Sequence, residues 1–113
     1  ILAGDWRIGV SGEFRIGLNE TSIGLPLPIA GLELARDRLE PTALQRATIN
    51  AEQFSPTNAA AIGYLDQVVE MFDFDSAVME AATRLGALDP DAFAETKRRV
   101  RQATITRIEK LGG

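Results

Sequence analysis

The amino-acid sequence predicts an α/β domain, residues 1–70, followed by a helical tail, residues 71–113. Apolar residues alternate with other residue types at Trp6, Ile8 and Val10, which is the period of a half-buried strand. In the middle of the domain the apolar spacing changes to the helical period. Beyond the domain every segment has a helical pattern, so the change in composition marks the boundary.

Three strands are expected within the domain. The first covers residues 5–10 and the second covers residues 14–18, with a turn signal at residues 11–12 between them. Taken alone, this arrangement predicts an antiparallel hairpin, with Trp6 directed into the core. A third, partly buried strand is expected over residues 64–70.

Helices are expected where a capping residue or a proline precedes an apolar stripe. The expected helices begin at Ile29, at Pro41, at Ser55 and Pro56 (ending at Gly63), at Asp73 or Asp75 (ending at Gly86), and at Asp89 and Pro90 (ending at Gly112 and Gly113). The first residue is Ile1 and not Met, and the first strand needs neighbours to pair with. We therefore expect the chain to be the carboxy-terminal part of a longer protein, whose amino-terminal half is its missing partner.

Composition excludes several classes of function. A formal charge of −4 argues against a nucleic-acid-binding protein, and no apolar run approaches the length of a membrane span. The chain has no Cys, which excludes disulfides and fits a reducing compartment such as the cytoplasm. It also has no His, so no metal site is predicted, and proton transfer falls to a carboxylate, a Lys or Tyr64.

Glu20 is the first candidate for chemistry. It ends the second expected strand and precedes an apolar, proline-bearing loop, residues 23–28. A poorly hydrated wall beside a carboxylate would favour a role in proton transfer. The residues alone favour a solvated surface position, because Glu is rarely buried. The loop itself either lines a pocket for an acyl chain or closes the end of the core.

Lys97 is the second candidate, because it falls within the apolar stripe of the last expected helix. One interpretation is that the aliphatic part of Lys97 packs on the apolar stripe while its ammonium reaches water. The other is that the ammonium contacts an anionic ligand. Arg98, Arg99 and Arg101 make this segment basic, as a solvated helix face or as a surface that attracts an anion.

The order of these segments resembles the second half of the enoyl-CoA hydratase/isomerase (crotonase) family. Four stretches carry the resemblance: GDWRI at 4–8, IGLNETSIGL at 16–25, PIAG at 28–31 and AAIGYLDQVV at 60–69. They are similar to the family's strand after its oxyanion-bearing helix, its F-x-x-P-E-x-x-x-G signature, its glycine-rich helix entrance and its A-x-x-x-G-L-V-x-x-V strand. Asn19 stands where the signature has Pro. Ala30 and Gly31 stand where the family has paired glycines. The extra methyl group restricts how closely the backbone can approach a ligand here.

The resemblance implies a crotonase-like α/β fold, carboxy-terminal half, with a tail that forms homo-trimers or dimers of trimers. It implies an acyl-CoA thioester as substrate, with coenzyme A as part of that substrate and no separate cofactor. Glu20 would be the general acid/base, and the substrate-binding residues would be Asn19, Leu25, Pro28 and Lys97, the last through a CoA phosphate. The two oxyanion-stabilising N–H groups and a second carboxylate would lie before Ile1. Hydration and double-bond isomerisation therefore both stay open.

Two other classes of function are compatible with the sequence. One is a non-catalytic oligomerisation fragment, or an inactive crotonase-like scaffold, that keeps the tail helices and has lost the chemistry. The other is a small helical binding module unrelated to CoA.

Overall fold

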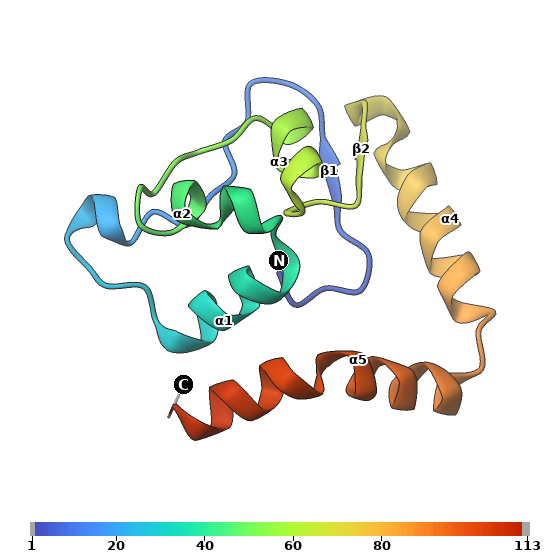
Figure 1. Ribbon diagram of the computed structural model, residues 1–113. Coiled ribbons are helices and arrows are strands. Elements are labelled where there is room, and N and C mark those ends of the chain that lie inside the picture. Colours follow the sequence, from blue (N-terminus) through green and yellow to red (C-terminus); the bar gives the residue numbers. More distant parts are fainter. Residues whose placement is uncertain (1, 112–113) are drawn as a thin grey trace.

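A computed structural model describes residues 2–111 of the chain. The elements, in chain order, are β1 (Ile8–Val10), the 3-10 helix η1 (Thr21–Ile23), α1 (Ile29–Arg38), η2 (Pro41–Ala43), α2 (Leu44–Ala47), α3 (Pro56–Ile62), β2 (Gln67–Val69), η3 (Met71–Asp73), α4 (Phe74–Gly86) and α5 (Pro90–Lys110). In Figure 1, α1, α2 and α3 lie on one side of the two strands and α4 lies on the other. The long helix α5 then runs back beneath α1 (Figure 1).

The two strands form a parallel pair. Ile8 lies opposite Gln67 and Val10 lies opposite Val69. The predicted hairpin is therefore wrong, although a strand was correctly expected near each end of the domain. Residues 14–18 form a single antiparallel bridge, in which Ile16 exchanges two backbone hydrogen bonds of 2.8 Å with Phe54. Alternation of apolar residues reports which face is buried and not which strand is the partner, and so the pattern could not exclude a parallel neighbour.

The core lies between the strands and helices α1 to α3. Its buried apolar residues are Leu2, Ala35, Leu39, Ala47, Phe54, Ala59, Tyr64 and Leu65. Ile16 and Leu18 pack against this cluster and are partly buried. Trp6 does not belong to it, contrary to prediction. More than a third of Trp6 is exposed, its indole N–H donates to Gln67 Oε1, and the Arg84 guanidinium lies over its ring.

The capping signals are mostly confirmed. Ser55 Oγ accepts a hydrogen bond from the Asn58 N–H at the start of α3, and Asp89 Oδ2 accepts one from the Ala92 N–H at the start of α5. Gly63 ends α3 with a φ of 102°, a conformation that favours glycine. The predicted helix end at Gly112 and Gly113 lies outside the described residues.

The helix expected from Pro41 is shorter than the apolar pattern predicted, because that pattern continued to Ala51. A 3-10 turn precedes α2, which ends at Ala47, and Ala51 has a left-handed backbone with a φ of 51°. Thr48, directly after α2, donates its hydroxyl back to the Leu44 carbonyl and remains buried. The chain then turns toward Phe54 and its bridge with Ile16.

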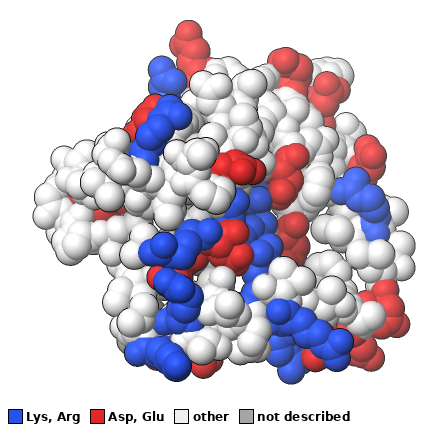
Figure 2. Space-filling model, viewed as in Figure 1, with Lys and Arg blue, Asp and Glu red and all other residues white. Residues whose placement is uncertain are grey.

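Helix α5 is attached to α1 by ion pairs. Arg107 Nε lies 2.6 Å from Glu33 Oε2, and Arg101 Nη1 lies 2.9 Å from Asp37 Oδ1. Glu33 is almost fully buried. Figure 2 shows blue and red side chains interleaved over the lower half of this face, where α1 and α5 lie in Figure 1. The basic residues of the tail are therefore partly used in fixing the tail to the domain.

Candidate active site

Glu20 lies in a tight turn directly before η1. Its backbone carbonyl accepts hydrogen bonds from the N–H groups of Ile23 at 3.1 Å and Leu25 at 2.9 Å. On the other side, Leu18 packs against the core. The backbone at Glu20 is therefore held from both directions, and the position of its side chain varies only through its own bond rotations.

The Glu20 side chain is half-buried, and its Oε2 atom is shielded from water with no hydrogen-bond partner among the described residues. A buried carboxylate oxygen without a donor is unusual, because carboxylates are normally paired or solvated when they are enclosed. The expectation of a poorly hydrated surface beside this carboxylate thus matches the geometry of one of its two oxygens.

Tyr64 is affected by the charge of this carboxylate. It is 1% exposed, and its hydroxyl also has no hydrogen-bond partner among the described residues. Burial, and secondly the negative charge of Glu20, raise the pKa of Tyr64 to about 12. The ring packs at 5.9 Å from the Phe54 ring, measured between centroids. The sequence indicated Tyr64 only as a possible proton carrier, and gave no signal that the charge of Glu20 acts on it.

The 23–28 loop begins beside Glu20 and leads into α1. Leu25 is more than half exposed, and Pro28 is the exposed residue that precedes α1. Asn19 is also exposed, and its backbone carbonyl accepts hydrogen bonds from the N–H and hydroxyl of Ser22. The turn therefore brings Asn19, Glu20 and Leu25 close along the chain, and the apolar side chain of Leu25 is available to contact a ligand.

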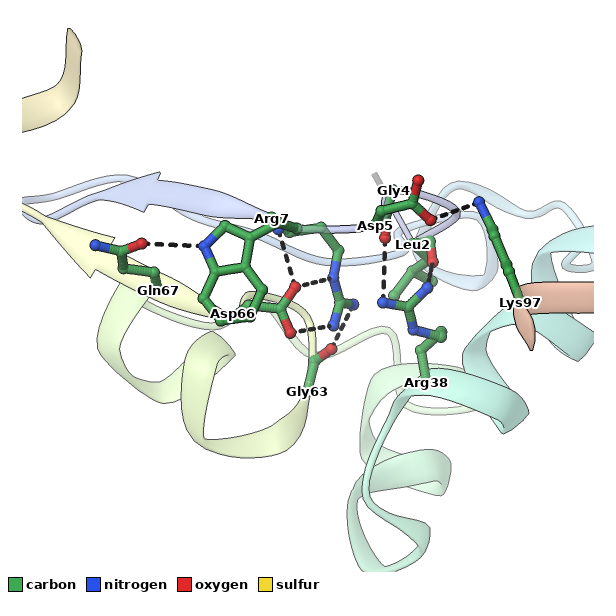
Figure 3. Close-up of polar contacts among 10 residues, drawn as sticks. Leu2, Gly4, Asp5, Arg7, Arg38, Gly63, Asp66, Gln67 and Lys97 are labelled. Atoms are coloured by element: carbon green, nitrogen blue, oxygen red, sulfur yellow. Dashed lines mark hydrogen bonds and ion pairs between the residues drawn. The ribbon is translucent and has the colours of Figure 1, made fainter. Parts of the chain in front are cut away.

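Lys97 occupies a different part of the molecule. Its ammonium contacts the Asp5 carboxylate at 2.5 Å, as drawn in Figure 3. It lines a cavity of about 430 Å³ whose apolar wall includes Leu88, Phe93 and Val100, and Glu20 does not line this cavity. The structure thus gives Lys97 a protein partner that the sequence did not predict, and does not bring it together with Glu20.

Polar contacts join the segments that lead into β1 and β2 with each other and with the end of α1 (Figure 3). Arg7 is buried, and its guanidinium donates to Asp66 and to the Gly63 carbonyl. Arg38 donates to the Leu2 and Gly4 carbonyls. Burial lowers the pKa of Arg38, as does the nearby charge of Arg7. These contacts place the amino-terminal segment between α1 and β2.

Among residues 2–111, no group of three His, Cys, Asp or Glu side chains is arranged to hold a metal ion. Over the same residues, no helix is both long enough and apolar enough to cross a membrane.

No protein-family model matches the chain. A curated human protein, the mitochondrial enoyl-CoA delta isomerase 1, is 34% identical over 109 residues, which cover 92% of this chain and 35% of that protein. Because this relative is mitochondrial by name, the expected cytoplasmic location stays a prediction.

Two solved structures share the fold. An enoyl-CoA hydratase/isomerase family protein from Pseudomonas syringae has a TM-score of 0.92 and 43% identity, over 96% of this chain and 47% of that chain. The human mitochondrial delta3-delta2-enoyl-CoA isomerase has a TM-score of 0.89 and 30% identity, over 96% of this chain and 43% of that chain. The chain thus spans between about a third and a half of the length of these relatives. The resemblance seen in the sequence is confirmed, because the chain matches the carboxy-terminal part of enoyl-CoA hydratase/isomerase family proteins in both sequence and crotonase-like fold.

Proposed function

We propose that this chain is part of an enzyme that moves a carbon–carbon double bond in enoyl-CoA thioesters, with Glu20 as the general acid/base. The observation that carries the proposal is the Glu20 carboxylate, held in a fixed turn with one oxygen buried and unpaired. The names of the human relatives support isomerisation of an enoyl-CoA.

The proposed reaction needs one carboxylate. Glu20 removes a proton from C2 of a 3-enoyl-CoA, and the electron pair moves into the thioester as a dienolate. The same proton then returns at C4, so the double bond shifts to C2–C3 and no other reactant is consumed. Backbone N–H groups that stabilise the thioester oxyanion would come from the part of the protein that this chain does not span.

Hydration of a 2-enoyl-CoA is the alternative reaction, and it normally uses a second carboxylate to activate water. That carboxylate would likewise lie outside this chain. Coenzyme A is then part of the substrate, and no separate cofactor takes part in the proposed proton transfer.

Asn19, Leu25 and Pro28 are proposed to contact the acyl-CoA. Their support is their position beside Glu20 in the turn and in the loop that follows it. The exposed Leu25 side chain supplies apolar surface for an acyl chain. Lys97 is proposed to contact a CoA phosphate, with its present contact to Asp5 giving way to the ligand.

Residues 1–70 are proposed to form the α/β portion, and residues 71–113 are proposed to form a tail. Through this tail the protein would associate with copies of itself as a homo-trimer or a dimer of trimers. The support is the apolar surface at the start of the tail, where Phe72 is 97% exposed and Met71 and Met79 are also largely exposed. Large apolar side chains exposed to this degree are typical of an interface.

The full-length protein tests the proposal with two substrates, 3-hexenoyl-CoA for isomerisation and crotonyl-CoA for hydration. We expect turnover of 3-hexenoyl-CoA, and a loss of roughly 10²–10⁴-fold in kcat in Glu20→Gln, because a general acid/base contributes about that much. Glu13→Gln is the matched control, since Glu13 is an exposed Glu of the preceding segment.

An unchanged rate in Glu20→Gln would refute the role of Glu20. Turnover of crotonyl-CoA alone would replace isomerisation by hydration. Turnover of neither substrate by the natural protein would favour the non-catalytic scaffold.

A further inference from the structure

Two buried polar side-chain atoms, one on Tyr64 and one on Glu20, lack hydrogen-bond partners among the described residues. Tyr64 OH and Glu20 Oε2 are both shielded from water, and neither makes a hydrogen bond within residues 2–111. A phenol O–H is a donor and a carboxylate oxygen is an acceptor, so the two atoms are chemically complementary. Leaving both unpaired costs free energy, and a Phe at position 64 would avoid the part that comes from the hydroxyl.

The backbone places Glu20 two residues beyond a side chain that packs on the core cluster containing Tyr64. Tyr64 belongs to the buried cluster against which Leu18 packs, and Glu20 follows Leu18 by two residues. The Glu20 backbone is held by the Ile23 and Leu25 N–H groups, while the Tyr64 N–H donates to the Ala59 carbonyl. Because both backbones are held, the Glu20 carboxylate can change its position relative to the hydroxyl only through rotation of side-chain bonds.

Burial, and secondly the charge of Glu20, raise the pKa of Tyr64 to about 12. Arg46 lies over the neighbouring Phe54 ring, but its guanidinium is paired with Glu52.

We propose that Tyr64 is a positioning residue for Glu20, whose hydroxyl donates a hydrogen bond to Oε2 in the working enzyme and leaves Oε1 to move the proton. This inference rests on the proposed function of Glu20. The bond satisfies both buried atoms and removes the freedom of the carboxylate to present either oxygen. It keeps the reacting oxygen in one orientation, which is the geometric requirement for efficient proton transfer.

The test combines kinetics and unfolding of the full-length protein. Tyr64→Phe removes only the hydroxyl and keeps the ring packed against Phe54. We expect kcat to fall about tenfold with an unchanged KM, because the substrate contacts remain while the carboxylate is less well oriented. A structural role alone would not separate kcat from KM in this way.

A double-mutant cycle in thermal unfolding reports the pair without any need for activity. We expect Tyr64→Phe to lower the melting temperature in the natural background and to leave it unchanged or higher in a Glu20→Leu background. Thr48→Val is the matched control, since it removes another buried hydroxyl, one that donates to the Leu44 carbonyl. Its effect should be the same in both backgrounds and should leave kcat unchanged.

Equal effects of Tyr64→Phe in both backgrounds would overturn the proposed hydrogen bond, whatever the activity. Coupling in a protein that turns over neither substrate would support the hydrogen bond and refute the proposed function. Coupling with an unchanged kcat would confirm the contact and overturn its role in positioning.

Discussion

Three N–H groups of Arg7 donate hydrogen bonds to the Asp66 carboxylate. The backbone N–H and Nε of Arg7 donate to Asp66 Oδ2 at 2.9 and 3.0 Å, and Nη2 donates to Oδ1 at 3.1 Å. Arg7 directly precedes β1 and Asp66 directly precedes β2. The contact therefore sets the register of the parallel pair at its entry, before the first ladder residues.

We expect Asp66→Asn to destabilise the domain by roughly 2 kcal/mol, because it leaves the buried Arg7 guanidinium without its counter-charge. The loss is smaller than for a fully buried pair, since the Asp66 side chain is 24% exposed. Chemical denaturation of the full-length protein measures it. Glu52→Gln is the control, because the Glu52–Arg46 pair is largely exposed and its loss should leave the midpoint nearly unchanged.

The same pair predicts a dependence on acid. Burial acts to raise the pKa of Asp66, but the hydrogen bonds and charge of Arg7 together lower it below its ordinary value of 3.8. Stability from this pair is therefore fully present above pH 3.8 and is lost as the pH falls through the lower value of the folded state. In Asp66→Asn this part of the acid dependence should disappear. If Asp66→Asn has the same acid transition as the natural protein, the Arg7–Asp66 pair does not cause the acid dependence.

Glu33 is expected to fix the tail to the domain. Its carboxylate is 2% exposed, and it lies 2.6 Å from Arg107 Nε and 3.6 Å from Arg36 Nε. Glu33→Gln should lower the free energy of local opening of α5 by about 2 kcal/mol, because it weakens a buried pair. Amide hydrogen exchange over residues 90–110 measures the opening.

The matched control for Glu33 is Glu95, which pairs with Arg98 and Arg99 on the exposed face of the same helix. Glu95→Gln should leave exchange over α5 nearly unchanged, since exposed pairs contribute little. If both variants open α5 equally, the buried pair does not anchor the tail.

Gly63 is expected to tolerate no side chain. Its φ of 102° disfavours other residues, and a Cβ at this position would overlap the Arg38 carbonyl oxygen. Gly63→Ala should cost about 3 kcal/mol, which sums the strain of a positive φ and the displacement of α1. Gly86→Ala is the control, because the space around Gly86 is open and its φ is not positive. Thermal unfolding of the two variants compares them.

Lys97→Ala tests the proposed contact to a CoA phosphate. We expect KM for the CoA thioester to rise about fivefold at low salt, the loss of one exposed charge contact. KM for the corresponding pantetheine thioester should stay unchanged, because that substrate lacks the nucleotide phosphates. Arg98→Ala is the control on the same helix. A rise in KM for both thioesters would indicate instead that losing the Asp5 contact distorts the fold.

Phe72 is expected to lie in a subunit interface. Its side chain is 97% exposed, at the junction between the domain and α4. Phe72→Ser should reduce the fraction of trimer at micromolar concentration, because it removes apolar area from the proposed contact. Light scattering of the full-length protein measures the assembly. An unchanged trimer would place the interface elsewhere on the tail.

The sequence predicted helix ends correctly where a single capping residue determines the local backbone conformation. Ser55, Asp89 and Gly63 begin or end helices as expected, because capping depends on residues within a few positions along the chain. The sequence correctly placed Glu20 before an apolar loop, but the strand expected to end at Glu20 is only a single bridge at Ile16, and Glu20 lies in a turn. That part of the candidate site was predictable because it is continuous in sequence.

Contacts between distant residues were not predictable. Ile16 bridges to Phe54 and not to the preceding strand, and the charge of Glu20 raises the pKa of Tyr64 although the two are far apart in sequence. Lys97 looked misplaced in an apolar stripe because its partner, Asp5, belongs to the other end of the chain. Periodicity shows which side of an element is covered, but it does not identify the covering residue.

The parallel pairing of β1 with β2 has a consequence for biosynthesis. Arg7 and Asp66, which open the two strands, are 59 residues apart. A ribosome adds about 5–20 residues per second, so β1 leaves synthesis roughly 3 to 12 s before its partner strand exists. During that interval the edge of β1 that will pair with β2 stays open to other growing polypeptides. Translational pauses between the two strands should therefore increase misassembly, whereas pauses after β2 should not.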